Sequence, residues 1–215
     1  MFQQRHLSSE DSDDEHDEFQ SACDYINNAT NYNKIQSRDQ YCAPQRTVRI
    51  SLKYISKEDK ILDFGAGTGL VGLSLVEFGF TNIHATDGSE HMLQIARESG
   101  IYKSHIVEVL YPGVKCSIPS ESFDAVICVG AIGPRDLPLH CLTEFVRIVR
   151  RKGNIVLTIR EKYMNADYCA KYWGSYNVQS KITALVQMKQ WKQIHQANVK
   201  YSATENGISM IFQKL

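Results

Sequence analysis

From residue 41 to residue 160, the chain alternates between short apolar runs and longer amphipathic segments. The short runs are bounded by glycine, proline and polar residues, and they predict strands at 61–64, 82–86, 104–110, 123–129 and 153–160. Between them, apolar residues three and four positions apart predict helices that begin at Pro44, Gly69, Ser89 and Pro138, the last ending at residue 151. We expect the helix over 69–78 to turn Leu70, Leu73 and Val76 inward.

The residues after 160 break this alternation. Residues 177–190 predict a helix, and residues 191–202 and 208–214 predict two strands. The Asn206-Gly207 pair between these strands is a hairpin turn signal. Alternating strands and helices followed by a terminal hairpin predict an α/β fold with a largely parallel sheet and an antiparallel edge.

Charge is distributed unevenly along the 215 residues. Residues 1–20 contain seven acidic residues, one basic residue and almost nothing to bury, so we expect a disordered acidic tail there. The remaining residues, 21–215, are long enough for one domain. Because the whole chain is formally neutral, this domain carries a charge of +6, which is too mild for the clustered basic face of a nucleic-acid-binding protein.

The cysteines and the apolar runs indicate where the protein resides. Six cysteines stand at positions 23, 42, 116, 128, 141 and 169, and because none forms a C-x-x-C pair we expect no metal site. Free thiols are typical of the cytosol or the nucleus. No apolar run approaches the roughly 18 residues of a membrane helix, and the polar first ten residues do not look like a secretory signal. We expect a cytoplasmic monomer, with the nucleus as the alternative location and no membrane partner.

A glycine-rich loop follows the first predicted strand, in the stretch Asp63-Phe64-Gly65-Ala66-Gly67-Thr68-Gly69. Such a loop lies at the carboxyl edge of a parallel sheet, where these sheets bind ligands. Residues 67–72 match the G-x-G-x-x-G pattern of dinucleotide folds, and Asp87 lies 20 residues after Gly67, at the offset of a ribose-binding acid. S-adenosylmethionine is the competing ligand for this loop.

Asp63 favours S-adenosylmethionine over a dinucleotide. It is an acid at the end of a buried strand, where an unpaired carboxylate is unfavourable. The methionine part of S-adenosylmethionine carries an ammonium and a sulfonium, whereas the pyrophosphate of a dinucleotide is anionic and would be repelled. Capping of the loop amides is the structural alternative for Asp63. Asp87 can accept both ribose hydroxyls, cap the helix that begins at Ser89, or do both.

Together these motifs resemble the class I S-adenosylmethionine-dependent methyltransferases over residues 41–160. The resemblance is carried by residues 61–69, 87–89, 122–126 and 151–154. Within that class the chain is most like the methyltransferase-like protein 27 (Williams–Beuren syndrome chromosome region 27) group, on the stretches Tyr41-Cys42-Ala43-Pro44, Gly100-Ile101-Tyr102 and Val129-Gly130-Ala131. This resemblance implies a Rossmann-like, seven-stranded, mostly parallel sheet with helices on both faces and a C-terminal antiparallel hairpin. Residues 21–215 would be the methyltransferase domain, with its core at 41–160.

The resemblance also implies roles for individual residues. Those that would line the methionine and ribose of the cofactor are Asp63, Gly65, Ala66, Gly67, Gly69 and Asp87. Those that would lie beside the adenine are Gly88, Met92, Leu110 and Tyr111. Val129 and Gly130 would face the reactive side of the cofactor. Tyr25 and Tyr32 match the spacing of a tyrosine pair in an N-terminal lid.

The chain departs from the family pattern in several places. The acid that many members have after the third strand is missing near Tyr111, so the adenine amine would meet a backbone carbonyl only. Ile26 and Asn33 stand where the lid usually has acids. The Asn-Pro-Pro-Tyr signature of exocyclic-amine methyltransferases is missing after the fourth strand, and no cysteine for methylation of base carbons is evident.

The methyl acceptor is not readable from the sequence. Methyl transfer from a sulfonium is an in-line displacement that depends mainly on alignment, so a general base is optional. The candidates for a base are Asp136, His140 and Tyr111, each with a loop or cap role as the alternative. Aromatic residues after the fifth strand can bind a planar acceptor or cover the sheet; they are Tyr168, Tyr172, Trp173 and Tyr176. The sequence predicts an enzyme that methylates a small molecule or a protein, with a non-catalytic cofactor-binding protein as the first alternative and a dinucleotide-dependent oxidoreductase as the second.

Overall fold

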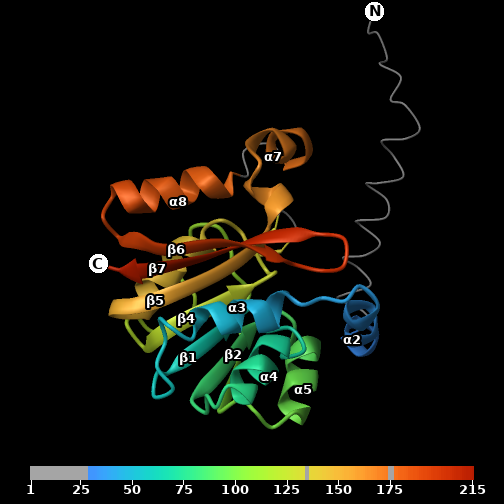
Figure 1. Ribbon diagram of the computed structural model, residues 1–215. Helices are drawn as coiled ribbons and strands as arrows, with labels where there is room; N and C mark the ends of the chain where they lie inside the picture. Colours follow the sequence, from blue (N-terminus) through green and yellow to red (C-terminus); the bar gives the residue numbers. More distant parts are fainter. Residues whose placement is uncertain (1–28, 134–135, 174–176) are drawn as a thin grey trace, which may run out of the picture.

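The computed structural model describes residues 29–133, 136–173 and 177–215. In this part of the chain, seven strands form one sheet in the order β3-β2-β1-β4-β5-β7-β6 (Figure 1). The strands are β1 (Ile61–Phe64), β2 (Ile83–Asp87), β3 (Ser104–Val107), β4 (Phe123–Val129), β5 (Val149–Arg160), β6 (Trp191–Lys200) and β7 (Asn206–Lys214). Strand β7 pairs antiparallel with β5 and β6, whereas the other neighbouring strands pair parallel. The Rossmann-like sheet with a C-terminal antiparallel hairpin is therefore confirmed.

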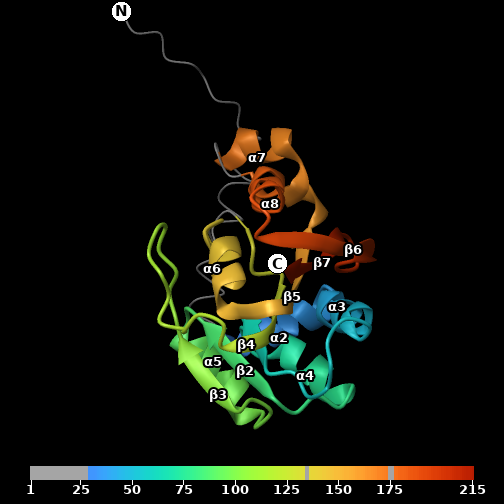
Figure 2. The ribbon, with the colours of Figure 1, turned by 90° about the vertical axis from the view of Figure 1, so that its left-hand side faces the viewer.

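Helices cover both faces of the sheet. The helical segments are α2 (Ala29–Arg38), α3 (Ala43–Ser51), α4 (Leu70–Glu77), α5 (Glu90–Glu98), α6 (Cys141–Ile148), the 3₁₀ turn η1 (Glu161–Met164), α7 (Ala166–Trp173) and α8 (Val178–Gln187). One apolar core lies under α3, α4 and α5, and a second lies under α6 and α8. Figure 2 shows α3 and α8 on opposite sides of the β6–β7 hairpin. No helix of the described residues is long and apolar enough to cross a membrane.

Several element boundaries differ from the sequence prediction. Strand β3 ends at Val107 instead of residue 110. The helix predicted over 138–151 is the shorter α6, because Val149 takes an extended backbone and pairs with Phe123 of β4. The apolar spacing at 145–149 continues into a strand residue, so periodicity alone does not mark where this helix ends.

The predicted inward face of α4 is wrong. Leu73 and Val76 are 43% and 42% exposed, and the buried positions of this helix are Val71, Gly72, Ser74 and Leu75. Helix α4 is apolar at nearly every position, so apolar spacing does not select one face. The backbone that leaves the glycine loop sets the rotation of the helix instead, because Gly69 holds its N-terminus with φ at +96°.

The hairpin turn lies earlier than the Asn-Gly signal suggests. Asn206 and Gly207 already belong to β7, where they pair with Lys200 and Val199. The turn is closed by the Tyr201 amide, which donates to the Glu205 carbonyl over 3.0 Å. Its position brings Tyr201 and Glu205 beside the carboxyl ends of β4 and β5, and both residues enter the site described below.

Candidate functional site

The glycine loop joins the ends of three neighbouring strands. The Gly65 and Ala66 amides donate to the Thr86 carbonyl at the end of β2, over 2.8 and 3.0 Å. A Cβ on Gly65 would lie 2.4 Å from the Cβ of Ala131, which follows β4. Gly65, Gly67 and Gly69 all have positive φ, between +55° and +96°. The loop therefore passes between β2 and β4 in a form that side chains at Gly65 would obstruct.

Asp87 fastens this loop to the start of α5. Its Oδ2 accepts the Gly67 amide over 2.8 Å, and its Oδ1 accepts the Ser89 amide over 2.9 Å. Ser89 is the N-cap of α5, because its hydroxyl accepts the Met92 amide over 3.3 Å. Burial raises the pKa of Asp87, and the backbone hydrogen bonds oppose that rise. Each carboxylate oxygen keeps a second lone pair, so Asp87 can order the loop and accept ligand hydroxyls at the same time.

Asp63 is a fully buried acid in β1. The Tyr102 hydroxyl donates to its Oδ2 over 2.6 Å, whereas its Oδ1 is buried without a hydrogen-bond partner among the described residues. Burial raises the pKa of Asp63 to about 7; the Tyr102 hydrogen bond and, more weakly, the nearby Gly72 amide oppose this shift, and the Asp87 charge adds to it. The acid therefore has a side-chain donor from outside the loop and one oxygen left for a ligand.

Apolar side chains lie beside the turn from β2 to α5. A Cβ on Gly88 would be 3.5 Å from Cγ2 of Val109. Leu110 and Met92 are buried, whereas Val109 and Tyr111 are 49% and 62% exposed. Glu108 does not replace the missing family acid here, because its carboxylate accepts the Ser117 amide over 3.0 Å. Val109 and Tyr111 therefore present two exposed apolar side chains in the segment that follows β3.

Two tyrosine hydroxyls meet at the end of β4. A Cβ on Gly130 would lie 2.4 Å from the Tyr201 hydroxyl and 2.5 Å from the Tyr41 hydroxyl. The rings of these tyrosines are 5.0 Å apart and their hydroxyls hydrogen-bond each other. The Cys42 and Ala43 amides both donate to the Tyr201 carbonyl, over 3.0 and 3.1 Å. Segments 160 residues apart in the sequence are thus joined where only a glycine leaves room for both hydroxyls.

Charged side chains stand behind this tyrosine pair. The Arg160 guanidinium lies 5.2 Å from the ring centre of Tyr201, and its Nε is 3.1 Å from Glu205 Oε2. Lys162 Nζ is 3.2 Å from the other oxygen of Glu205. Burial raises the pKa of Tyr201, and the Arg160 charge opposes that rise. The Tyr201 hydroxyl is therefore neutral at physiological pH and can act as a hydrogen-bonding group.

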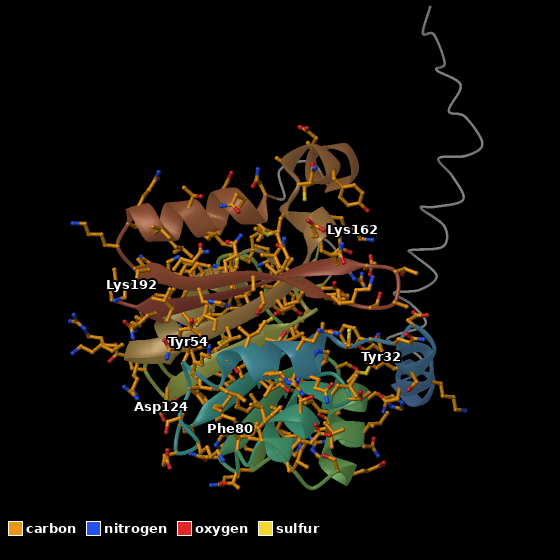
Figure 3. The ribbon with its side chains drawn as sticks, in the orientation of Figure 1. Tyr32, Tyr54, Phe80, Asp124, Lys162 and Lys192 are labelled. Carbon is orange, nitrogen blue, oxygen red and sulfur yellow. The ribbon has the colours of Figure 1, made fainter. Side chains whose placement is uncertain are left out.

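Helix α2 reaches both parts of the site. The Thr68 hydroxyl in the glycine loop donates to Asn33 Oδ1 over 2.7 Å. Tyr32 lies close enough to Tyr41 to raise its pKa, although burial has the larger effect. Figure 3 shows Tyr32 and Lys162 towards the carboxyl ends of the strands, whereas Tyr54 and Asp124 lie towards the other end. Tyr25, the other predicted lid tyrosine, lies outside the described residues, as do residues 1–20.

The candidate bases occupy different surroundings. His140 is the N-cap residue of α6, and its Nε2 is 3.1 Å from the Val114 carbonyl. Tyr111 is exposed beside Val109. Asp136 lies near enough to Tyr201 and Tyr163 to raise the pKa of both, although burial has the larger effect on each. Asp136 is thus the candidate that the fold brings towards the tyrosine pair.

The predicted aromatic cluster is described only in part. Tyr168 packs against the core under α6 and α8, which favours a covering role for it. Tyr176 and the side chains of Tyr172 and Trp173 lie outside the described residues. Within residues 29–133, 136–173 and 177–215, no three histidine, cysteine, aspartate or glutamate side chains are grouped to hold a metal ion.

Comparison with known proteins agrees with this geometry. Residues 62–157 match the family described as a methyltransferase domain. The chain is 35% identical over 108 residues to methyltransferase-like protein 27 of Homo sapiens, and the match covers 50% of this chain and 43% of that protein. The chain resembles the class I S-adenosylmethionine-dependent methyltransferases in sequence and in fold. It spans less than half the length of the curated relatives it matches.

Solved methyltransferase structures share the fold. A chain from the complex between the Haloferax volcanii Trm112 methyltransferase activator and a methyltransferase aligns with a TM-score of 0.67 at 14% identity, covering 88% of this chain and 97% of that one. The S-adenosylmethionine-dependent methyltransferase of Mesorhizobium loti aligns with a TM-score of 0.57 at 16% identity, covering 80% of this chain and 98% of that one. At these identities the likeness extends to the fold alone.

Sequence reasoning missed several residues of this site. Tyr201, Arg160 and Glu205 come from a strand end and a turn whose apolar pattern carries no functional signal. Tyr102 belongs to the stretch Gly100-Ile101-Tyr102 that carries the family resemblance, but no local pattern pairs it with the buried Asp63. Val109 has a weak signal, because it lies two positions before Tyr111 and shares its exposed face.

Proposed function

We propose that this chain binds S-adenosylmethionine and transfers its methyl group to a small-molecule or protein acceptor by in-line displacement. The observation that carries the proposal is the Oδ1 of Asp63 at the carboxyl end of β1, which is buried and has no hydrogen-bond partner in the described part of the chain. A buried carboxylate oxygen without a donor is unfavourable, and a cationic ligand relieves that cost. An ammonium group suits this oxygen, whereas a pyrophosphate does not.

The residues around the loop fit the rest of this cofactor. Bound S-adenosylmethionine supplies a methyl group that is already activated on a sulfonium. Asp63 accepts the ammonium, and Asp87 accepts ribose hydroxyls beside the two amides that it already holds. The remaining cofactor-binding positions in this proposal are Gly65, Ala66, Gly67, Gly69, Gly88, Met92, Val109, Leu110, Tyr111, Val129, Gly130, Tyr32 and Tyr25.

The tyrosine pair at Gly130 is placed to orient the acceptor. The topological switch point of the sheet lies between β1 and β4, and ligands bind at such points. Asp87 puts the ribose on the β2 side, which leaves the β4 side for the acceptor. There Tyr41 and Tyr201 present neutral hydroxyls, and Asp136 is the candidate base. Alignment of this kind can supply up to about 7–11 kcal/mol of a displacement barrier, so no base is required.

The cysteines support a reducing compartment. Those in the described part of the chain are free thiols: Cys42, Cys116, Cys128, Cys141 and Cys169. Burial raises the pKa of the Cys128 and Cys141 thiols, which keeps them protonated and unreactive. We infer that the protein works in the cytoplasm or the nucleus.

Calorimetry with the full chain tests cofactor binding. We expect S-adenosylmethionine and S-adenosylhomocysteine to bind and NAD not to bind. Asp87→Asn should weaken S-adenosylhomocysteine binding about tenfold to hundredfold, because one charged acceptor for hydroxyls and amides is lost. Asp124→Asn is the matched control, since Asp124 bonds the Lys60 amide and Arg150 at the far end of the strands. Failure of both sulfur ligands to bind the wild-type chain would overturn the proposal.

Transfer itself is tested with a labelled methyl group. The full chain and labelled S-adenosylmethionine are added to a cell extract, and the labelled product is separated into small-molecule and protein fractions. We expect label in one fraction, and about tenfold to hundredfold less label with the Asp87→Asn chain when the cofactor concentration is below the Kd of both chains. Tight cofactor binding without any labelled product would instead support the non-catalytic alternative.

A further inference from the structure

Tyr102 connects the buried acid to the helix that follows the glycine loop. Its hydroxyl donates to Asp63 Oδ2 over 2.6 Å and accepts the Gly72 amide of α4 over 3.2 Å. The side chain is only 7% exposed. Its ring lies against the loop, because a Cβ on Gly69 would be 3.2 Å from Cε2 of Tyr102. One hydroxyl thus joins β1 and α4 from a segment that precedes β3.

The surroundings fix this hydroxyl in place. The Lys103 amide donates to the Ile83 carbonyl over 2.8 Å, which holds the segment on β2. The Tyr102 ring meets the His105 ring edge to face, with centres 5.6 Å apart. A Cβ on Gly72 would be 2.3 Å from the Tyr102 oxygen, so the residue at 72 must be glycine for the hydroxyl to reach Asp63. Glycine at positions 69 and 72 therefore leaves room for the Tyr102 side chain to reach Asp63.

Fixing one oxygen of a carboxylate also fixes the other. A carboxylate that rotates freely points its oxygens anywhere around its axis, whereas one held at Oδ2 has a defined direction for Oδ1. In Asp63 that second oxygen is the one without a partner in the described structure. We propose that Tyr102 is a positioning residue: its hydroxyl holds Asp63 so that Oδ1 receives the ammonium of the cofactor, and so selects ligands that keep the amino-acid part. This inference rests on the proposed function.

The same contact makes cofactor binding depend on pH. The titratable groups that face Asp63 are Tyr102, Asp87 from β2 and Cys128 from β4, whose thiol is neutral. Burial raises the pKa of Asp63 to about 7, and the Tyr102 hydrogen bond limits that rise. An ammonium pairs with the ionised acid, so affinity should fall as pH falls through about 7. Without the hydroxyl, the acid keeps its proton to a higher pH.

Two ligands that differ only in the amino-acid part test the inference. S-adenosylhomocysteine has the ammonium, and 5′-methylthioadenosine lacks the whole amino-acid part. We expect the wild-type affinity for S-adenosylhomocysteine to fall below pH 7, and that for methylthioadenosine to stay flat. In Tyr102→Phe, the pH at the midpoint of this fall in S-adenosylhomocysteine affinity should be higher than in the wild type. At pH 7 the S-adenosylhomocysteine affinity should be about tenfold weaker, with methylthioadenosine changed less than about twofold.

A second variant and a control keep the test independent of folding. Gly72→Ala leaves Tyr102 intact but pushes its hydroxyl away from Asp63, and alanine suits the helical backbone at this position. It should reproduce the Tyr102→Phe result. Tyr54→Phe is the matched control, because Tyr54 packs at the other end of the sheet beside His195. Its ligand affinities and pH midpoint should equal those of the wild type.

Each contrary result has a distinct meaning. Equal losses for both ligands in Tyr102→Phe and Gly72→Ala would make Tyr102 a support for the loop and would overturn its role in selection. If both variants have the ligand affinities and the pH midpoint of the wild type, the role of Tyr102 in selection is also overturned. If the wild-type chain binds neither ligand, the proposed function fails and this inference fails with it; normal wild-type binding separates the two cases.

Discussion

The β2 side and the β4 side of the candidate site are built in different ways. On the β2 side, backbone groups do most of the holding: Asp87 binds the Gly67 and Ser89 amides, and Thr86 binds the loop through its carbonyl. On the β4 side, side chains from distant segments meet, as Tyr41 and Tyr201 do at Gly130. The first arrangement suits a ligand with a fixed shape, which in the proposed function is the cofactor. The second can change with single substitutions and leave the sheet intact, so we assign it to the variable partner, the acceptor.

The same substitution on each side gives the largest contrast. Gly65→Ala should lower the free energy of unfolding by several kcal/mol and abolish S-adenosylhomocysteine binding. The new Cβ would lie 2.4 Å from the Cβ of Ala131, and alanine would have to adopt a φ of +75°. Gly130→Ala should displace the two hydroxyls and abolish labelled-methyl transfer, but should weaken cofactor binding less than Gly65→Ala does, because Gly130 faces only the reactive side of the proposed cofactor. Urea unfolding, calorimetry and the transfer assay measure the three quantities.

Gly67→Ala separates backbone strain from collision. Gly67 has a φ of +55°, yet a Cβ there meets nothing within 4 Å, so we expect the free energy of unfolding to fall by only about 1 kcal/mol. If Gly130→Ala abolished cofactor binding as fully as Gly65→Ala does, the division of the site into two sides would be wrong.

Two buried carboxylates provide the next test, through pH. Asp63 has its pKa raised to about 7 by burial, whereas Arg147 and the Cys116 amide overcome the burial of Glu144 and lower its pKa to about 2. The folded state binds the Asp63 proton more tightly than the unfolded chain does, so stability should fall as pH rises from about 4 to about 7. Glu144 contributes stability above about pH 4 that is lost as pH falls towards 2.

Urea unfolding of the ligand-free chain between pH 2.5 and 8 should therefore show a maximum near pH 4. The decline above it is at most about 4 kcal/mol, from three pH units at about 1.36 kcal/mol each. Asp63→Asn should reduce the decline above pH 4 to the part that comes from Asp87, whose pKa burial also raises, and Glu144→Gln should remove the decline below pH 4. A flat profile above pH 4 in the wild type would show that Asp63 has a second partner in the free protein.

The sequence predicts these parts unequally. The elements of the β2 side lie within short stretches, so the strand at 61–64, the glycine loop and the Ser89 cap follow from local pattern and turn chemistry. Tyr201 and Arg160 meet Gly130 only because β7 returns antiparallel beside β5, and no local pattern gives the register of that pairing. The inward face of α4 cannot be predicted locally for a similar reason, because the rotation of the helix depends on Gly69 and not on the apolar spacing within the helix.

The smallest predicted effect concerns α2, which contacts both sides of the site. Thr68→Val removes the hydroxyl that donates to Asn33, a bond over 2.7 Å at a residue only 4% exposed. We expect the free energy of local opening of α2 to fall by about 1 kcal/mol, which would be measured as faster hydrogen exchange of the α2 amides only. Cofactor affinity should fall less than about fivefold, because no proposed ligand contact is removed.

The exchange pattern decides to which side α2 belongs. Helix α2 is also linked to the β4 side, because Tyr32 lies near Tyr41 and the Tyr41 amide donates to the Gln36 carbonyl over 2.9 Å. If Thr68→Val frees all of α2, the loop holds the helix, and cofactor binding should in turn slow its exchange. If α2 exchanges no faster, the Tyr41 side holds it. Tyr41→Phe should then free it, because that variant breaks the hydroxyl pair and leaves the Thr68 bond in place. In that case α2 responds to the acceptor, and an acceptor analogue would protect it where S-adenosylhomocysteine does not.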